Sequence, residues 1–556
     1  MSAPFGIDLG TTNSVISRLV DGRPVPIAIA GDPIVPSVVL FAGDRVVVGR
    51  EARNLELEHP EQTIRSVKRK MGQDFTYEIN GARRTPEEVS AEILRALKEG
   101  AAATTGVPVQ DVVITVPAYF DDAQRRATLK AGELAGLNVL RLLNEPTSAS
   151  LVYEKVDRAR ATGEPELILI YDLGGGTFDV SVLECFEGVR EVRATTGNSA
   201  LGGDDFDELL VRHFVDSLKG RQGVNPSDDP RAMARLRRVA ESTKIALSTA
   251  TSVEVREEFL TKHQGKPIHL ELEVTRRELE AMIAPLVDST LALVRQAVAD
   301  AKLGDQRLSH ICLVGGSTRI PLVRAHLEAE LGVDVRDEVD VDLAVGLGAA
   351  IQAGILLGAP VERILVDVAS HSLGLKAFGQ EDEFRDEVDT FVRLIPRNTA
   401  LPALRAEEFY TIVDQQERIS VEVYQGESSR TSENTRVGAF DYPLKPCPAH
   451  TPVKVQFEYD LNGVVKVSVT QRGAEEKTVA LSVADASAAP SSATLGPAAR
   501  LGSAVERKGR RLLESLGGAE KARLEALLTR LEGASDAQRE AFEDELLDFF
   551  LDVEAD

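Results

Sequence analysis

The chain has 556 residues and a formal net charge of −24, with 64 Lys and Arg against 88 Asp and Glu. One hydrophobic core rarely supports so long a chain, so two or three domains are expected. The hydrophobic fraction of 43% excludes overall disorder. The acidic balance argues against nucleic acid or an anionic membrane as the main partner, because phosphate groups attract clustered Lys and Arg.

The three cysteines, Cys185, Cys312 and Cys447, are isolated, with no CxxC pair and no His at ligand spacing. A zinc site or a disulfide framework is therefore not expected, and Cys185 and Cys312 fit as small hydrophobic core residues. No targeting segment is recognisable, and no apolar run approaches the roughly 20 residues that cross a bilayer. We therefore expect a cytoplasmic protein.

Residues 5–360 alternate short apolar runs with helical patterns, which is typical of an α/β domain. Thr85, Pro86 and Glu88 form a helix start signal with a capping box. A polar, proline-bearing loop is expected at 221–230. The periodicity predicts strands at 38–41, 112–116, 167–171 and 311–314, and helices at 86–103, 122–137, 229–248, 275–301 and 320–331.

From about residue 361 the pattern changes to short alternating runs at 419–424, 453–459 and 464–470, typical of an antiparallel β domain. Leu461-Asn462-Gly463 lies between two runs and predicts a hairpin turn. The sequence thus predicts a first domain at 1–360, a linker at 361–369, a β domain at 370–483, an Ala/Ser/Pro linker at 484–499 and a helical segment at 500–556.

Two segments of the first domain resemble each other, GIDLGTTNSVIS at 6–17 and YDLGGGTFDVSV at 171–182. In each, a strand ends in Asp-Leu-Gly before a Gly- and Thr-rich turn, where backbone N–H groups can approach phosphate oxygens. Asp8 and Asp172 at the strand ends can hold hydrated magnesium or orient water. One copy alone would be a plain tight turn, but two copies indicate two pseudo-equivalent lobes around one nucleotide. Walker and Rossmann glycine motifs are absent.

A third glycine site, Gly315-Gly316, lies in ICLVGGSTRIPLV (311–323) between a predicted strand and a predicted helix. Such a site suits a base or ribose lying against exposed backbone, although alone it would be an ordinary strand-to-helix turn.

In this order the three sites resemble the actin–hexokinase–heat-shock ATPase superfamily. Six motifs are similar in sequence to those of the DnaK-type 70-kilodalton heat-shock chaperones. They are GIDLGTTNS, VPAYFDDAQRRAT (116–128), LNEPTSAS (143–150), DLGGGTFDVS, LGGDDFD (201–207) and LVGGSTRIP. The resemblance extends over about residues 5–483, because it also includes VDVASHSLGL (366–375), RNTALP (397–402) and YQGE (424–427). It implies an α/β actin-like ATPase domain with two pseudo-equivalent lobes, an antiparallel β-sandwich peptide-binding domain and a short helical C-terminal segment.

The resemblance also implies site roles. Asp8, Asp172 and Asp179 would surround magnesium and the attacking water, with Asp8 and Asp172 reaching the ion through water. Lys68 would face the γ-phosphate; without the resemblance it would be a solvated charge beside Arg69 and Lys70. The expected catalytic set is completed by Glu145 and Thr177. The expected nucleotide contacts are Gly10, Thr11, Thr12, Asn13, Gly174, Gly175, Gly176, Gly202, Gly203, Glu241, Lys244, Ser248, Gly315, Gly316, Ser317, Arg319 and Asp342. Before Asp342, Asp340-Val341 replace the usual Asn-Pro.

Other positions match the family's coupling and peptide-binding residues. Pro117 and Arg125 match a relay that senses ATP, and Arg141 and Asn144 match J-domain docking positions. The linker residues Ile364, Leu365, Val366 and Asp367 match the family's apolar linker. Its apolar residues are expected to be buried against the first domain in the ATP state and exposed otherwise, with Arg363 weakening the docking. The expected peptide channel comprises Leu375, Ala377, Phe378, Phe409, Ile412 and Ile419, with a bulky arch at Phe378 and Ile412.

The chain departs from DnaK in having only about 55 helical residues after the β domain. This shortness, with FDYPLK (440–445) and FEYDLNGVVKVSV (457–469), resembles the HscC-like bacterial paralogues and implies a specialised chaperone. We also expect a monomer. The expected ligands are ATP or ADP, Mg²⁺ and K⁺; the expected partners are client polypeptides and a J-domain co-chaperone, with the need for a nucleotide exchange factor open. Two alternatives remain at this point: a small-molecule kinase of the same superfamily, and a regulator that binds ATP without hydrolysing it.

Overall fold

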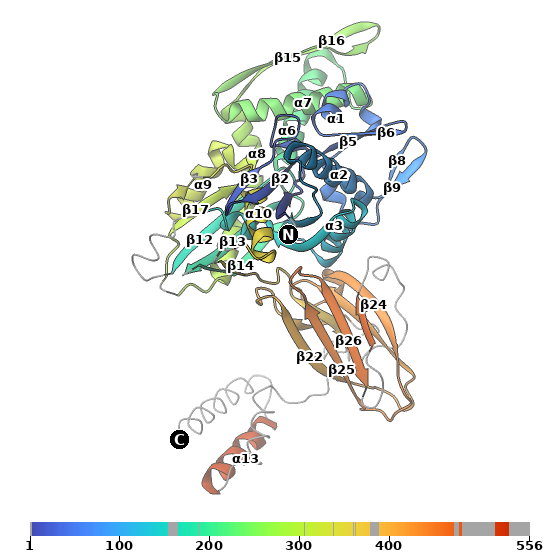
Figure 1. The fold of residues 1–556 in the computed structure, drawn as a ribbon, viewed down its shortest axis with the longest axis vertical. Coiled ribbons are helices and arrows are strands. Elements are labelled where there is room, and N and C mark those ends of the chain that lie inside the picture. Colours follow the sequence, from blue (N-terminus) through green and yellow to red (C-terminus); the bar gives the residue numbers. More distant parts are fainter. Residues whose placement is uncertain are drawn as a thin grey trace.

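The computed structural model describes residues 3–153, 165–186, 188–304, 306–336, 339–359, 361, 363–377, 389–471, 477–480 and 518–532. The predictions for Phe378 and for the linker at 484–499 lie outside these described residues. Of the predicted helical segment at 500–556, the described part is helix α13 (Gly518–Glu532). Figure 1 shows the helices and sheets of the first domain above the strands of the β domain.

The first domain contains a sheet with the strand order β11-β10-β1-β2-β3 and a short β4 (Val35–Pro36) on β2. Strand β1 pairs in parallel with β10 and antiparallel with β2. The bounds are β1 Phe5–Asp8, β2 Asn13–Val20, β3 Arg23–Pro26, β10 Asp111–Val116 and β11 Asn138–Asn144. With α2 (Pro86–Thr105) and α3 (Asp122–Leu134), this sheet buries one hydrophobic core, which we call the first lobe.

A second sheet follows, with the order β18-β17-β12-β13-β14-β19. Strand β12 pairs in parallel with β17 and antiparallel with β13, so its first five strands repeat the order and directions of the first sheet. The bounds are β12 Glu166–Leu173, β13 Phe178–Phe186, β14 Val189–Asn198, β17 His310–Val314, β18 Val335–Arg336 and β19 Ile364–Val366. The duplication predicted from the two DLG segments is thus confirmed. This sheet and its helices form the second lobe.

The remaining elements of the first domain surround these sheets (Figure 1). In the first lobe they are β5 Val38–Ala42, β6 Arg45–Val48, α1 Arg50–Leu55, η1 Pro60–Gln62, β7 Thr63–Arg65, η2 Val67–Lys70, β8 Tyr77–Ile79, β9 Ala82–Arg84 and α4 Glu145–Ser150. In the second lobe they are α6 Gly203–Gln222, α7 Pro230–Leu247, β15 Ser252–His263, β16 Lys266–Thr275, α8 Arg276–Asp300, η3 Gly316–Arg319 and α9 Pro321–Leu331. Helix α10 (Ala344–Leu356) packs on β1, β2 and α4.

The predicted element types are confirmed, and the differences lie at their ends. The capping box of α2 at Thr85 and Glu88 is present. Helix α3 ends at Leu134 rather than at 137, because Gly136 has a left-handed φ of 68° and Asn138 begins β11. Helix α6 runs to Gln222, into the segment predicted as a loop. Cys185 and Cys312 are buried in a hydrophobic core, as expected, and Cys447 is buried as well.

One described helix, α8, is long and apolar enough to cross a membrane by length and composition, contrary to our expectation that the sequence holds no such run. Its Leu279, Ile283 and Val287 are buried in the core of the second lobe. The helix packs against β13 and β14, so its apolar character serves to cover the sheet.

In its described residues, the β domain contains two four-stranded antiparallel sheets around one core. The turn predicted at Leu461–Gly463 joins β25 and β26, with Gly463 at a left-handed φ of 69°. One sheet contains β21 Thr390–Ile395, β20 Leu373–Ala377, β23 Arg418–Gln425 and β24 Thr435–Pro443; the other contains β22 Ala403–Tyr410, β25 Pro452–Tyr459, β26 Val465–Gln471 and β27 Lys477–Ala480. A short 3-10 helix, η5 (Thr431–Glu433), precedes β24.

The predicted linker adds strand β19 to the second sheet, in parallel with β14. Leu365 and Val366 are half-buried and Ile364 is 62% exposed, so the burial expected for the ATP state stays a prediction. Arg363 donates from Nη1 to the carbonyl of Leu151, and it therefore adds a contact where we expected weaker docking.

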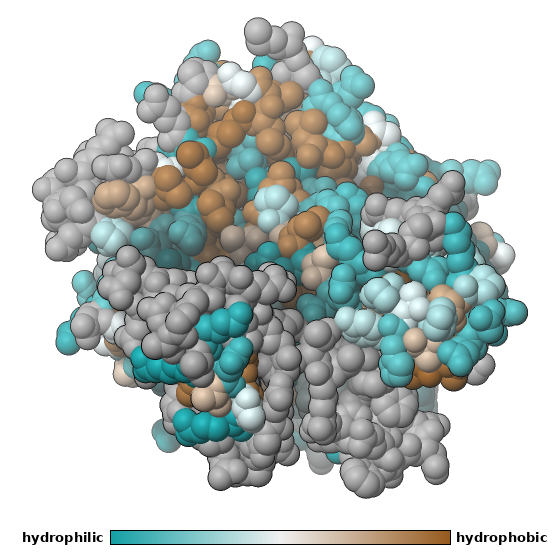
Figure 2. All heavy atoms as spheres, turned by 90° about the horizontal axis from the view of Figure 1, so that it is seen from below, coloured by the Kyte–Doolittle hydropathy of each residue, from teal (hydrophilic) through white to brown (hydrophobic). Residues whose placement is uncertain are grey.

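Figure 2, viewed from below, shows an extensive hydrophobic region among hydrophilic side chains on the described surface.

Candidate functional site

A cavity opens between the two glycine-rich turns and the Gly315-Gly316 site. It brings together most of the residues that the sequence assigned to phosphate and magnesium. Its predicted members are Asp8, Gly10, Thr11, Thr12, Asn13, Lys68, Glu145, Asp172, Gly174, Gly175, Thr177, Gly315, Gly316 and Asp342. The apolar part of the wall is formed by Val15, Ile34, Val314, Val341 and Val345.

Close approach requires glycine at several positions of this cavity, among them Gly175 and Gly315. A Cβ on Gly175 would lie 1.8 Å from the Thr12 hydroxyl oxygen, so the two phosphate turns meet only because this side chain is absent. Gly315 has a left-handed φ of 82°, and a Cβ there would lie 2.4 Å from the Leu173 carbonyl oxygen. Both positions expose backbone toward the cavity.

Several buried carboxylates crowd one side of the cavity. Asp8 accepts a hydrogen bond from Thr115 Oγ1 at 3.0 Å, and Asp179 accepts one from the Tyr119 N–H at 3.0 Å. Burial, reinforced by the charge of Glu145, raises the pKa of Asp8 and of Asp179 to about 7. The same causes, again with burial first, raise the pKa of Asp172 well above its usual range.

Lys68 is the cation of this group and forms an ion pair with Glu145. Both side chains are buried, at 4% and 6% exposure, so the alternative of a solvated surface lysine is excluded. The Lys68 ammonium also lies 5.7 Å from the centre of the Phe120 ring. One ammonium faces four acids, Asp8, Asp172, Asp179 and Glu145. This excess of negative charge suits a divalent cation such as Mg²⁺.

The described residues contain no group of three or more His, Cys, Asp or Glu side chains that could hold a metal ion together. A cation at Asp8 and Asp172 would therefore complete its coordination with water and phosphate oxygens, as Mg²⁺ usually does.

Several predicted site residues, catalytic and nucleotide-binding, do not line the cavity. Asp179 is buried beside it and held by the Tyr119 N–H. Glu241 pairs with Arg53 at 2.8 Å and Arg65 at 3.1 Å. Ser248 ends α7, with its hydroxyl donating to the Lys244 carbonyl at 3.4 Å. The predicted nucleotide residues outside the cavity wall are Gly176, Gly202, Gly203, Glu241, Lys244, Ser248, Ser317 and Arg319.

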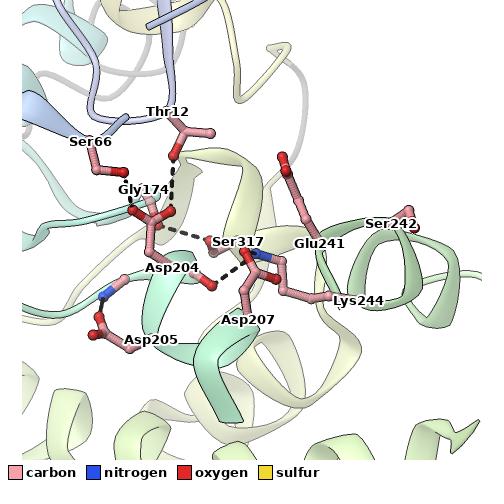
Figure 3. A network of polar contacts seen from close by, with 12 residues as sticks. Thr12, Ser66, Gly174, Asp204, Asp205, Asp207, Glu241, Ser242, Lys244 and Ser317 are labelled. Atoms are coloured by element: carbon pink, nitrogen blue, oxygen red, sulfur yellow. Dashed lines mark hydrogen bonds and ion pairs between the residues drawn. The ribbon is translucent and has the colours of Figure 1, made fainter. Parts of the chain in front are cut away.

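Two of these residues are nevertheless fixed close to the turns. The Lys244 ammonium binds the Gly203 carbonyl at 2.9 Å and the Asp207 carboxylate at 2.8 Å. Figure 3 shows Lys244 beside Asp207. The Ser317 hydroxyl donates to the Gly174 carbonyl at 2.9 Å. Arg319 forms ion pairs with both Asp340 and Asp342. Because Asp340-Val341 replace the family's usual Asn-Pro, this chain has a second carboxylate beside Arg319.

The sequence analysis missed three residues that support the site: Thr115, Ser66 and Asp204. Thr115 orients Asp8, and Asp204 accepts hydrogen bonds from Ser66 and from the predicted Thr12. Asp204 stands in the LGGDDFD motif, from which only the glycines were assigned a role. Thr115 carried no signal, because a threonine in a buried strand is ordinary.

The predicted relay residues join the two domains. Arg125 donates to Asn144 Oδ1 at 2.8 Å and, across the domain boundary, to the Asn462 carbonyl at 3.0 Å. Asn144 Nδ2 in turn donates to the linker residue Asp367 at 2.9 Å. The Pro117 carbonyl accepts from the Phe120 N–H in the turn that leads into α3.

Arg141 is placed differently from what a docking surface requires. It is 7% exposed, and burial lowers its pKa, so in this conformation the side chain is not available to a J-domain partner. The neighbouring Leu142 N–H donates to Asn462 of the β domain, which covers this strand.

The predicted peptide-channel residues fall into two groups. Leu375, Ala377, Phe409 and Ile419 are fully buried in the β-domain core. Ile412, on the loop that follows β22, is 42% exposed. The neighbouring Val413 is also exposed, at 57%, so this loop presents adjacent apolar side chains to solvent.

Comparison with known proteins gives one consistent result. The profile of the family described as "Hsp70 protein" matches residues 4–81 and 75–545. Chaperone protein DnaK of Thermotoga petrophila is 43% identical over 478 residues, which cover 84% of this chain and 78% of that protein. The proteins of the same name from Thermotoga sp. strain RQ2 and from Thermotoga maritima show the same identity and coverage.

Proposed function

The chain belongs to the Hsp70 family, whose members are ATPases, and from this premise we propose that it couples ATP hydrolysis to capture and release of extended apolar peptide segments. One observation carries the proposal. Glu145 pairs with Lys68 in the nucleotide cavity, while the preceding residue, Asn144, binds Arg125 and Asp367 at the domain boundary. Two adjacent residues at the start of α4 thus connect the cavity with the linker.

In the ATPase domain, which we propose has the actin-like form, the two glycine-rich turns would hold the phosphates through backbone N–H groups and the Thr11, Thr12 and Thr177 hydroxyls. Mg²⁺ bound near Asp8 and Asp172 would neutralise phosphate charge. The Lys68 ammonium, oriented by Glu145, would stabilise the charge that develops on the transferred phosphoryl oxygens. Asp179 would orient the attacking water, and K⁺ is proposed as a second ion.

The β domain would bind an apolar segment beside the loop that carries Ile412. When ATP moves Glu145, the displacement would reach Asn144, Arg125 and the linker without an intervening flexible segment. The proposed partners are client polypeptides and a J-domain co-chaperone, and the proposed state is a cytoplasmic monomer. The short helical segment would release peptide faster than a long lid does.

The test is a peptide-release experiment on the full-length protein. A fluorescent apolar peptide is bound without nucleotide and its dissociation is followed after addition of ATP, ADP or buffer with Mg²⁺. Acceleration by ATP alone, with peptide-stimulated phosphate release, is the expected result. Phosphate transfer to a sugar or organic acid in place of water would favour a small-molecule kinase, and ATP binding without hydrolysis would favour a regulator.

The exposed arch residue Ile412 gives a prediction on selectivity. Ile412→Ala removes apolar surface beside the proposed channel, so affinity for peptides with bulky central residues should fall roughly threefold to tenfold. A peptide array compares this variant with Leu404→Ala, which truncates an exposed apolar residue on β22. Equal binding profiles for Ile412→Ala and the wild type would contradict a role in selectivity.

His371, which follows the linker, predicts a pH dependence of domain docking. Its Nε2 lies 3.0 Å from the Tyr119 carbonyl oxygen, and the two rings lie 4.2 Å apart between centroids. Burial lowers the pKa of His371, opposed by the Tyr119 carbonyl and by the nearby Asp121 and Glu427 and aided by Arg125. The docked state therefore binds fewer protons than the separated state.

Docking should accordingly weaken as the pH falls through the usual His pKa of 6.5, by at most about tenfold per pH unit. A fluorescence-transfer pair on the two domains, read from pH 8 to 5.5 in the presence of ATP, measures this loss. His371→Asn should flatten the profile below the same pH. An unchanged slope in that variant would assign the pH dependence to other groups.

A further inference from the structure

The first turn of helix α6, in the second lobe, meets the first-lobe segment that carries Lys68. Asp204 accepts a hydrogen bond from the Ser66 hydroxyl at 2.6 Å and one from the Thr12 hydroxyl at 3.3 Å, as Figure 3 shows. The adjacent Asp205 binds the guanidinium of Arg69 through both carboxylate oxygens, with Nη1 to Oδ1 at 3.1 Å. Ser66 and Arg69 thus stand on either side of Lys68, and both are tied to α6.

The two carboxylates are themselves fixed to the second phosphate turn. The Gly203 N–H donates to the Gly174 carbonyl at 2.9 Å, and the Asp204 N–H donates to the Gly175 carbonyl at 2.7 Å. Asp205 also accepts from the N–H of Gly202 at 2.8 Å, which closes the start of the helix. The first turn of α6 is therefore a rigid support attached to the turn that holds phosphate.

Ser66 shows that the Lys68 segment is held in place rather than merely adjacent. Its φ of 51° is left-handed, which a serine adopts only where the surroundings compensate the backbone strain. The short bond from its hydroxyl to the Asp204 carboxylate is charge-assisted, and such bonds are the stronger class. Lys68 follows two residues later in η2, so the direction of its side chain depends on this backbone.

We propose that Asp204 and Asp205 are positioning residues for Lys68, acting through Ser66 and Arg69 across the boundary between the two lobes. The proposal rests on the role of Lys68 proposed above and adds its mechanism of placement. The ammonium would reach its working position only when the lobes are closed on α6, because the supports belong to one lobe and the lysine to the other. Hydrolysis would then depend on lobe closure even with nucleotide fully bound.

A purely structural role for Asp204 and Asp205 would have different consequences. If Asp204 and Asp205 only held the lobes together, their loss would weaken nucleotide binding and thermal stability, and the chemical step would follow in proportion. A positioning role lowers the rate of the chemical step with ATP already bound. Single-turnover hydrolysis of preloaded ATP separates the two, because it is independent of product release.

The experiment compares Asp204→Ala, Ser66→Ala and the double variant in the full-length protein with Mg²⁺. Each single variant should slow single-turnover hydrolysis by about 10- to 100-fold, as small misplacements of a catalytic group do, with little change in the dissociation constant for ATP. The double variant should be no slower than the slower single variant, since the two residues share one bond. Glu208→Ala, which removes an exposed α6 carboxylate paired with Arg237, is the matched control and should keep the wild-type rate.

Ser66→Asn provides a rescue, because asparagine tolerates the left-handed backbone and keeps a donor for Asp204. It should be faster than Ser66→Ala. Additive losses in the double variant, or losses in ATP affinity that account for the slower rate, would overturn the positioning role. Lys68→Ala distinguishes failure of the proposed function from failure of this inference. A wild-type rate in Lys68→Ala would refute the role of Lys68 itself. A slow Lys68→Ala, with wild-type rates in Asp204→Ala and Ser66→Ala, would refute only the positioning role of Asp204.

Discussion

Lys68→Ala should reduce ATP turnover at saturating ATP by roughly 10²- to 10³-fold, the effect of removing one fixed donor from a site where negative charge develops. The ammonium is buried and bound to Glu145, so its position is set before the reaction begins. Phosphate release under steady-state conditions measures the loss. Lys70→Ala is the matched control, because Lys70 lies two residues away in η2 but is exposed.

The alanine variant has a second effect that the experiment must separate. It leaves Glu145 without its cation beside Asp8 and the buried Asp172 and Asp179. Removing one partner of such a buried pair costs about 3–5 kcal/mol of stability. The double variant Lys68→Ala/Glu145→Gln removes that uncompensated charge and should recover thermal stability but not turnover. Turnover of Lys68→Ala within about twofold of the wild type would contradict a catalytic role, since one oxyanion donor is worth far more.

The architecture of the first domain could be predicted because its signals are local. Each phosphate turn is encoded by about a dozen consecutive residues. Strands and helices can be located because apolar residues repeat every two residues along a strand and every 3.6 along a helix. The repeated DLG segments predicted two lobes, and the shared strand order of the two sheets shows why: both strands before the turns are flanked by the same parallel and antiparallel neighbours.

The partners within the site could not be predicted, because they are far apart in the chain. Lys68 pairs with an acid 77 residues away, and Arg69 with one 136 residues away. Periodicity says nothing about such pairs, and a lysine between Val67 and Arg69 has the same local pattern on a surface as in a cleft. The burial of Ile364 likewise depends on distant parts of the chain, because β19 is an edge strand and its exposure is set by what covers that edge.

The second large effect is expected at the linker. Asp367 is 4% exposed, accepts from Asn144 at 2.9 Å and is the charge that most strongly opposes the lowering of the Arg125 pKa by burial. Asp367→Ala should therefore leave the Arg125 guanidinium without its main counter-charge. Loss of one partner of a buried pair costs about 3–5 kcal/mol, which would shift the docking equilibrium by roughly 10²- to 10⁴-fold toward separated domains.

Because Arg125 also holds Asn462 of the β domain, the variant should lose acceleration of peptide release by ATP and stimulation of hydrolysis by peptide. Basal single-turnover hydrolysis should persist, because no atom of Asp367 lines the nucleotide cavity. Asp216→Ala, which truncates an exposed acid on α6 paired with Lys219, is the control. Retained coupling in Asp367→Ala would mean that the path from Glu145 to the β domain bypasses the linker. Loss of both coupling and basal hydrolysis would place Asp367 in support of the cavity itself, and the two activities would then no longer be separable at this residue.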